Sequence, residues 1–218
     1  MRKILHLYII YRLPISLALI ALGVASHIWG DPILAWILYI VALFSILLYF
    51  MLGTMRLVKD AVEDGEVDKA MGYIDKIKYP KLLLKPVRSA YFMLQSSLNM
   101  ANNDLDKAED NIRKSLNTKS SLTGDMRGTN LMQLGFVQLR KGNAKEARLT
   151  LVQAIKAGIP DKEGLAGVYL QLCSMEVQRS QNRVGKEYFR KAKALNPRSK
   201  EIVEQIKIME KNIARIPG

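Results

Sequence analysis

Residues 128–161 read GTNLMQLGFVQLRKGNAKEARLTLVQAIKAGIPD, and this stretch decides the fold. Large apolar residues at helical spacing fill its first half, and the turn Lys141-Gly142-Asn143 separates that half from a second apolar series. The second series contains Ala147, Leu151 and Ala154, and it stops before Pro160, which cannot continue a helix. The stretch therefore predicts two short helices that face each other across a tight turn.

The same pattern occurs four times between residues 64 and 198. In each copy a turn is followed by a small residue, which is Ala70, Ala108, Ala147 or Gly185, at intervals of 38, 39 and 38 residues. A larger apolar residue follows four positions after each small one. Self-similarity at a fixed period predicts stacked helical repeats that share one continuous core.

At these residues the chain resembles the tetratricopeptide repeat (TPR) family, whose unit is a pair of helices of about 34 residues. The packing positions of that family correspond here to Ala70, Ala108, Leu134, Gly135, Ala147, Leu172 and Gly185. The resemblance implies an all-α solenoid of three to four helix pairs, at about residues 56–80, 89–121, 128–161 and 166–198, with a capping helix and tail over 199–218. Because the observed spacing exceeds the family's by about four or five residues, we expect extended helices or turns.

The first 55 residues differ from the rest in composition, because no Lys or Arg occurs between Leu13 and Leu52. Two apolar runs, residues 13–30 and 33–52, each approach the roughly 20 residues that cross a bilayer as a helix. Basic residues precede the first run and follow the second, but the turn between the runs has none. We therefore expect a transmembrane hairpin in a bacterial inner membrane, with both termini and the repeats in the cytoplasm. A cleaved signal peptide is the alternative for the first run.

The second apolar run leads directly into residues 56–63, which would form the first helix of the earliest repeat. This continuity predicts one long helix that runs from the bilayer into the solenoid.

Charge and rare residues limit the chemistry of the chain. From Arg56 onward there are 30 basic and 19 acidic residues, a net charge of +11, which favours acidic proteins, anionic lipids or nucleic acid. We expect no specific nucleic acid partner. The two histidines lie in the N-terminal segment, and the single cysteine, Cys173, occupies a small packing position. The sequence thus predicts no catalytic residue, no cofactor and no metal site, since the acids at 104–110 surround a helix start.

The resemblance also implies where a partner would bind, because the first helices of TPR pairs line a groove for peptides or helices. The corresponding positions here are apolar and rich in methionine: Met93, Met100, Met132, Phe136, Leu139, Leu170 and Val177. Methionine adapts its shape to varied side chains, so this lining suits an amphipathic helix or an extended apolar segment. The alternative is that residues 199–213 or a neighbouring repeat fill the groove in cis.

Two groups of basic residues complete the candidate surfaces. The first is a basic patch of Arg183, Lys186, Arg190 and Lys193 on one helix face, which is either a docking site for acidic protein or lipid, or a solvated face. The second comprises Lys76, Lys78, Lys81, Lys85 and Arg88, where we expect contact with lipid headgroups. The sequence therefore predicts a non-enzymatic, membrane-anchored scaffold or adaptor for protein–protein interaction. The alternative is a structural or assembly subunit of a larger transport or secretion complex, held through its hairpin.

Overall fold

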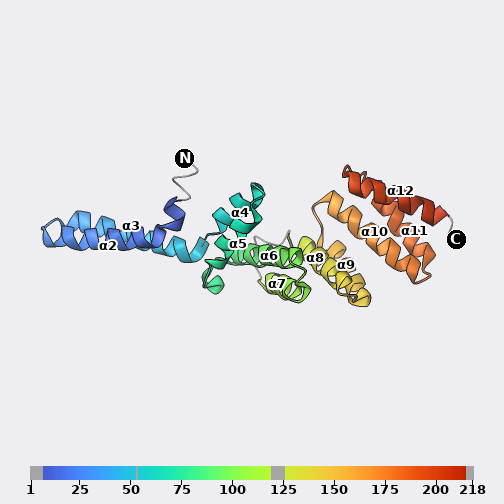
Figure 1. The fold of residues 1–218 in the computed structure, drawn as a ribbon, viewed down its shortest axis with the longest axis horizontal. Helices are drawn as coiled ribbons and strands as arrows, with labels where there is room; N and C mark the ends of the chain where they lie inside the picture. Colours follow the sequence, from blue (N-terminus) through green and yellow to red (C-terminus); the bar gives the residue numbers. More distant parts are fainter. Residues whose placement is uncertain (1–6, 53, 119–125, 215–218) are drawn as a thin grey trace. The chain divides into compact units, whose positions relative to one another are not determined.

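The structure is a computed structural model and describes residues 7–52, 54–118 and 126–214. All regular secondary structure in these ranges is helical. The chain forms two compact units, Met1–Tyr91 and Phe92–Gly218. The helices are α2 (Arg12–Ile28), α3 (Pro32–Leu52), α4 (Met55–Glu63), α5 (Val67–Asp75), the 3₁₀ turn η1 (Pro80–Leu82), α6 (Lys85–Ala101), α7 (Leu105–Asn117), α8 (Arg127–Arg140), α9 (Ala144–Ala157), α10 (Lys162–Gln178), α11 (Asn182–Ala194) and α12 (Lys200–Ala214) (Figure 1).

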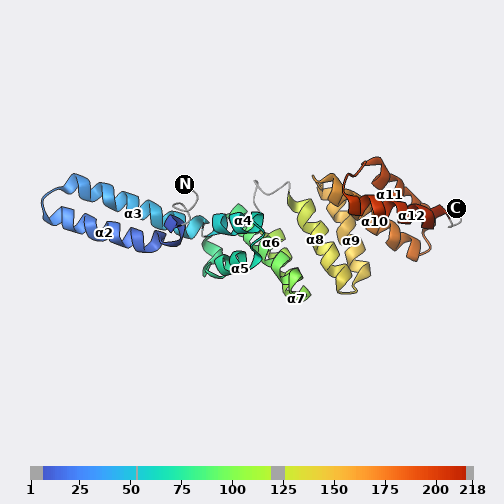
Figure 2. The same cartoon turned by 45° about the horizontal axis from the view of Figure 1, so that its top comes forward.

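In the first unit, α2 and α3 lie side by side as an antiparallel hairpin (Figures 1 and 2). Apart from Arg12 at the start of α2, the buried positions are small residues: Ser16, Gly23 and Ser26 of α2 and Ala35, Ala42 and Ser45 of α3. Such residues let two backbones approach closely, as in helices that associate within lipid. The outer surface is apolar instead of polar, with Leu22, Ile40, Leu43 and Phe44 each about 60% exposed.

Among the described helices, only α3, at 21 residues, is both long and apolar enough to cross a membrane. The helix α2 is also apolar, though less so than α3, and has 17 residues, which span about 25 Å, less than the roughly 30 Å of a hydrocarbon core. The hairpin expected from the sequence is therefore present as a pair of packed helices, whereas one helix alone meets the requirement for a span.

The expectation of one continuous helix from the hairpin into the first repeat is wrong, because α3 ends at Leu52 and a separate helix, α4, begins at Met55. Thr54 explains where α4 starts. Its carbonyl accepts the N–H of Val58 at 3.1 Å, while its hydroxyl donates to the carbonyl of Tyr73 at 2.6 Å. The side chain thus binds the backbone of α5.

The turn that ends each first helix has the same backbone geometry in all four helix pairs. The residues Gly65, Asn103, Gly142 and Ser180 have φ of 75°, 58°, 83° and 60°, and they follow α4, α6, α8 and α10 respectively. In each case the next residue donates its N–H to a carbonyl five positions earlier, which is the Schellman arrangement. These positions recur at the same 38- or 39-residue interval as the small packing residues, so backbone and sequence share one period.

Within the second unit, α8 packs on α9 and α10 packs on α11 (Figure 2). The small packing residues allow these contacts. A Cβ on Gly135 would lie 2.6 Å from Leu151, and a Cβ on Gly185 would lie 2.8 Å from Val177. Ala108, Ala147 and Leu172 are fully buried, Leu134 is 4% exposed, and in the first unit Ala70 is 1% exposed. In the second unit, the core therefore lies between the helices of each pair and between neighbouring pairs.

Candidate functional site

The predicted groove residues do not line one open channel, because their side chains are buried to different depths. Met93 and Leu170 are buried, with 8% and 2% of their surface exposed, so a partner cannot reach them in this structure. The others are half-buried and pack against the cores around them: Met100, Met132, Phe136, Leu139 and Val177. The side chains most accessible to a partner are therefore not the ones that the family resemblance indicated.

The C-terminal helix α12 covers one end of this face in cis. Ile202, Ile206, Met209 and Ile213 of α12 pack against the core that contains Leu170 and Cys173. The carboxylate of Glu163 in α10 accepts the backbone N–H groups of Arg198 and Ser199 at 2.6 and 3.2 Å, which fixes the start of α12. At Leu170 and Val177 the structure thus shows the alternative in which the chain fills its own groove.

The basic patch lies on α11 and is partly neutralised by acidic neighbours. Arg183 and Arg190 are exposed, and Lys186 is half-buried. Lys193 pairs with Glu210 of α12 at 2.7 Å, so the C-terminal end of the patch contributes less charge than its sequence suggests. An exposed pair of this kind contributes little to stability, typically less than about 1 kcal/mol.

Sequence reasoning missed a further basic surface, a pocket of about 390 Å³ between α9 and the end of α10. We call it the α9–α10 pocket, and its lining residues are Ala144, Lys145, Arg148, Leu149, Met175, Gln178 and Arg179. Leu149 is 53% exposed, whereas Met175 is 6% exposed, so the two form an apolar rim and an apolar floor. Lys145 and Arg179 are exposed, which places two cations beside this apolar surface.

A buried carboxylate orders one wall of the α9–α10 pocket. Glu176 is 1% exposed, and its Oε1 accepts a short hydrogen bond from Nε of Arg148. Its other oxygen lies 3.7 Å from Nη1 of Arg179. A charge at this depth is tolerated only when it is paired, so Arg148 is held in place by Glu176. Three cations around one buried anion leave a net positive pocket that complements a carboxylate.

The pocket was not visible in the sequence because its parts are far apart along the chain. Arg148 and Glu176 are 28 residues apart, and neither has an unusual local context. One signal was available: Leu149 is a large apolar residue at a second-helix position adjacent to the buried Thr150 and Leu151, on the opposite side of α9 from Ala147. A large exposed apolar residue among cations is a common mark of a contact surface.

Other chemistry-bearing residues have structural roles. Cys173 is fully buried, and burial raises the pKa of its thiol to about 11, so little thiolate is present near neutral pH. Acids of α7 are paired with cations: Asp106 and Glu109 each lie 2.7 Å from Nζ of Lys141, and Asp110 lies 2.5 Å from Lys114. Asp106 and Glu109 thereby join α7 to Lys141, the residue that follows α8, whereas the pair of Asp110 and Lys114 lies within α7.

Comparison with known proteins supports the fold. No protein-family model and no curated protein sequence matches the chain. A solved structure described as a functional characterization of Pseudomonas aeruginosa pilF is similar, with a TM-score of 0.56 and 13% identity, and the match covers 93% of this chain and 88% of that chain. That neighbour contains tetratricopeptide repeats, so this chain has a TPR-like helical repeat fold. Folds of this type typically bind other proteins and are typically not catalytic.

Proposed function

We propose that the chain is a membrane-anchored scaffold whose hairpin inserts into the bilayer and whose helical repeats bind a protein partner at the cytoplasmic face. The anchoring is supported by the distribution of residues on α2 and α3, which is the reverse of that in a water-soluble protein. Small residues lie inside the hairpin, and large apolar residues lie on its outer surface. A water-soluble protein rarely exposes so large a contiguous apolar surface.

The length of α2 is compatible with a span when the residues before it are included. Residues 7–10 are helical, and hydrogen bonds from Tyr11 N–H to Leu7 and from Ile15 N–H to Tyr11 continue the backbone pattern into α2. Tyr11, with φ −96° and ψ 14°, separates this turn from α2, so α2 reaches the thickness of the hydrocarbon core only when the turn at residues 7–10 adds to its length. Arg12 lies within this stretch and is 7% exposed, and its guanidinium makes a cation–π contact with the ring of Tyr8, 5.2 Å from the ring centre.

Orientation follows from the distribution of basic residues. The turn at Gly30 and Asp31 has no basic residue, whereas Arg56 and Lys59 follow the hairpin at its other end. The excess of Lys and Arg on one side favours a cytoplasmic location for both ends of the hairpin and for the repeats.

The partner surface that the geometry supports best is the α9–α10 pocket. It combines the exposed side chain of Leu149 with the cations Lys145 and Arg179, and it is not covered by α12. The complementary ligand is an acidic protein segment that carries a large apolar side chain. The half-buried residues Met132 and Phe136 remain a weaker candidate, because partner contact there requires movement of the core that they pack against.

Topology is tested with single cysteines in a Cys173→Ser background. A membrane-impermeant maleimide is applied to right-side-out and inverted vesicles from the cells that express the chain. We expect Asp31→Cys to react only in right-side-out vesicles and Lys200→Cys only in inverted ones. Labelling of both from the same side, or extraction of the protein by alkaline carbonate, would show that the hairpin does not span the membrane.

Partner binding is tested with a photo-crosslinking amino acid at position 149, in the intact chain in its native membrane. The matched control is position 184, where Val184 is also exposed but lies on α11. We expect a discrete adduct from position 149 that disappears with Lys145→Glu and Arg179→Glu, and none from position 184. Adducts that are unaffected by these charge reversals would exclude the pocket. Adducts that form only from the hairpin helices would instead favour a subunit held within a larger membrane complex.

A further inference from the structure

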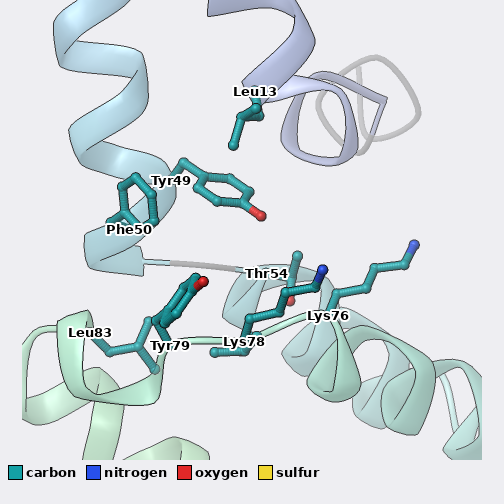
Figure 3. Close-up of a pocket in the computed structure, with 9 residues that line it drawn as sticks. Leu13, Tyr49, Phe50, Thr54, Lys76, Lys78, Tyr79 and Leu83 are labelled. Carbon is teal, nitrogen blue, oxygen red and sulfur yellow. The ribbon is translucent and has the colours of Figure 1, made fainter.

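A second cavity, of about 290 Å³, lies in the first unit where the hairpin ends. We call it the hairpin-end pocket. The ends of α2 and α3 form one side of it, and the segment that follows α5 forms the other (Figure 3). Its lining residues are Leu13, Tyr49, Phe50, Thr54, Lys76, Ile77, Lys78, Tyr79 and Leu83.

Hydrogen bonds between distant segments hold the walls of this pocket together. The Thr54 hydroxyl donates to the carbonyl of Tyr73, and the N–H of Leu84 donates to the carbonyl of Met51 at 3.0 Å. Nη2 of Arg88 donates to the carbonyl of Leu83, also at 3.0 Å, and to the carbonyl of Lys81. The segment 76–84 is therefore fixed against the end of α3, and the pocket exists before any ligand arrives.

The polar side chains of the pocket are two lysines and three hydroxyl groups, those of Tyr49, Thr54 and Tyr79, and no carboxylate is among the lining residues. Lys76 and Lys78 are exposed, and within the described part of the chain neither ammonium group has an ion-pair partner. In Figure 3 both ammonium groups and the hydroxyl of Tyr49 extend toward the same side of the pocket. Two ammonium groups and a phenol are suitable donors for the oxygens of a phosphate.

The apolar part of the pocket is continuous with the outer surface of the hairpin. Phe50 and Tyr49 pack edge to face at the end of α3, and Leu13, at the start of α2, is 37% exposed. Beyond them along α3 lie exposed apolar residues such as Leu47. A ligand that is anionic at one end and apolar at the other would contact both parts at once.

We propose that the hairpin-end pocket binds one anionic phospholipid, with the headgroup phosphate between Lys76 and Lys78 and the acyl chains along Leu13 and Phe50. This inference rests on the anchoring proposed above, which places the end of α3 at the level of the headgroups. A lipid of net charge −1 such as phosphatidylglycerol fits better than phosphatidylcholine, because the choline cation would be repelled by the two lysines.

A lipid explains the pocket better than a soluble phosphate or an acidic protein does. A soluble phosphate would leave the rings of Tyr49 and Phe50 unused. An acidic protein segment would have to enter between the hairpin and the segment after α5, at the place where the bilayer surface already supplies phosphates at high density.

The test uses the full-length chain in nonionic micelles, to which equal amounts of phosphatidylglycerol and phosphatidylcholine are added, and native mass spectrometry to count the lipid retained. Each lysine near a headgroup is expected to change anionic-lipid affinity about fivefold, so retention of phosphatidylglycerol should exceed that of phosphatidylcholine roughly 25-fold. Lys76→Gln with Lys78→Gln should abolish this preference. The matched control, Lys81→Gln with Lys85→Gln, removes the same charge from exposed residues outside the pocket and should retain it.

Three results would overturn the lipid site: equal retention of the two lipids by the unmodified chain, an unchanged preference in the Lys76 and Lys78 variant, or full displacement of the lipid by soluble glycerol phosphate. Tyr49→Phe removes one phosphate donor without a change of charge. Because both lipids carry a phosphate, it should weaken the retention of both and leave the preference for phosphatidylglycerol unchanged. Failure of the anchoring proposal is separable, because it is measured by alkaline extraction of membranes and does not depend on which lipid the micelle-bound protein retains.

Discussion

Replacement of Arg148 by Met is expected to destabilise the α9–α10 region strongly, because it removes the main partner of a buried carboxylate. Glu176 is 1% exposed and would keep only Arg179, whose nearest nitrogen lies 3.7 Å away on a side chain that is 57% exposed. Removing one member of a buried pair costs about 3–5 kcal/mol, and the remaining contact places this case at the low end, about 3 kcal/mol.

The single cysteine provides the assay. Cys173 is fully buried on α10, one turn before Glu176, so a maleimide reacts with it only when this region opens. When closing is faster than labelling, the labelling rate follows the opening equilibrium. A cost of about 3 kcal/mol therefore predicts a rate increase on the order of 100-fold for Arg148→Met. The measurement follows one thiol in the intact chain, so it does not require a purified protein.

Two further variants separate loss of the charge pair from loss of packing. The double variant Arg148→Met with Glu176→Met replaces the pair by apolar groups, so its labelling rate should return to within about tenfold of the unmodified chain. Arg183→Met removes an exposed arginine of α11 and should change the rate by no more than about threefold. A rate for Arg148→Met within threefold of the unmodified chain would refute the reasoning, as would a double variant that is labelled as fast as the single one.

Three other predictions concern backbone geometry and pH. Ser180→Gly should stabilise the chain by about 1 kcal/mol, seen as slower thiol labelling, because Ser180 holds a φ of 60° that glycine adopts without steric cost. Gly128→Ala should lower the melting temperature by several degrees or prevent folding, since the new Cβ would lie 1.7 Å from the carbonyl oxygen of Gly158, a backbone atom with no rotamer to change. Burial alone would raise the pKa of the Glu109 carboxyl, but hydrogen bonds from Lys141 and a neighbouring arginine lower it on balance. Its stabilising contribution is thus present above the ordinary glutamate value and lost as the pH falls through the lowered one, so the melting temperature should be constant from about pH 5 to about pH 8 and fall below about pH 4.

The repeat architecture could be predicted from sequence because the same turn, with a residue of positive φ, recurs at a constant interval. The turn residues Gly65, Asn103, Gly142 and Ser180 have positive φ in the structure, and Gly and Asn are the residues that most readily adopt it. Ala147 follows the turn and is fully buried, as the periodic pattern required. Local rules and helical periodicity were sufficient here because each pair of helices is formed by consecutive residues.

The binding surfaces could not be predicted in the same way, because they depend on which helices lie next to each other and how deeply each side chain is covered. Leu170 and Leu149 are both leucines at helical spacing, yet Leu170 is 2% exposed and Leu149 is 53% exposed. The difference arises from α12, which covers the face of Leu170 and leaves the α9–α10 pocket uncovered. Likewise, the separation of α3 from α4 depends on a hydrogen bond between Thr54 and Tyr73, which are 19 residues apart.

The position of α12 has a consequence for biosynthesis. Leu170, Cys173 and Phe189 pack against apolar residues of α12, which leaves the ribosome after α10 and α11. Until that last helix has been translated, the face that it covers is exposed to water and to other nascent chains. A chain truncated by a stop codon near residue 199 would therefore lose more than a terminal helix, because it would expose an aggregation-prone apolar surface. We expect a cell to degrade such a chain.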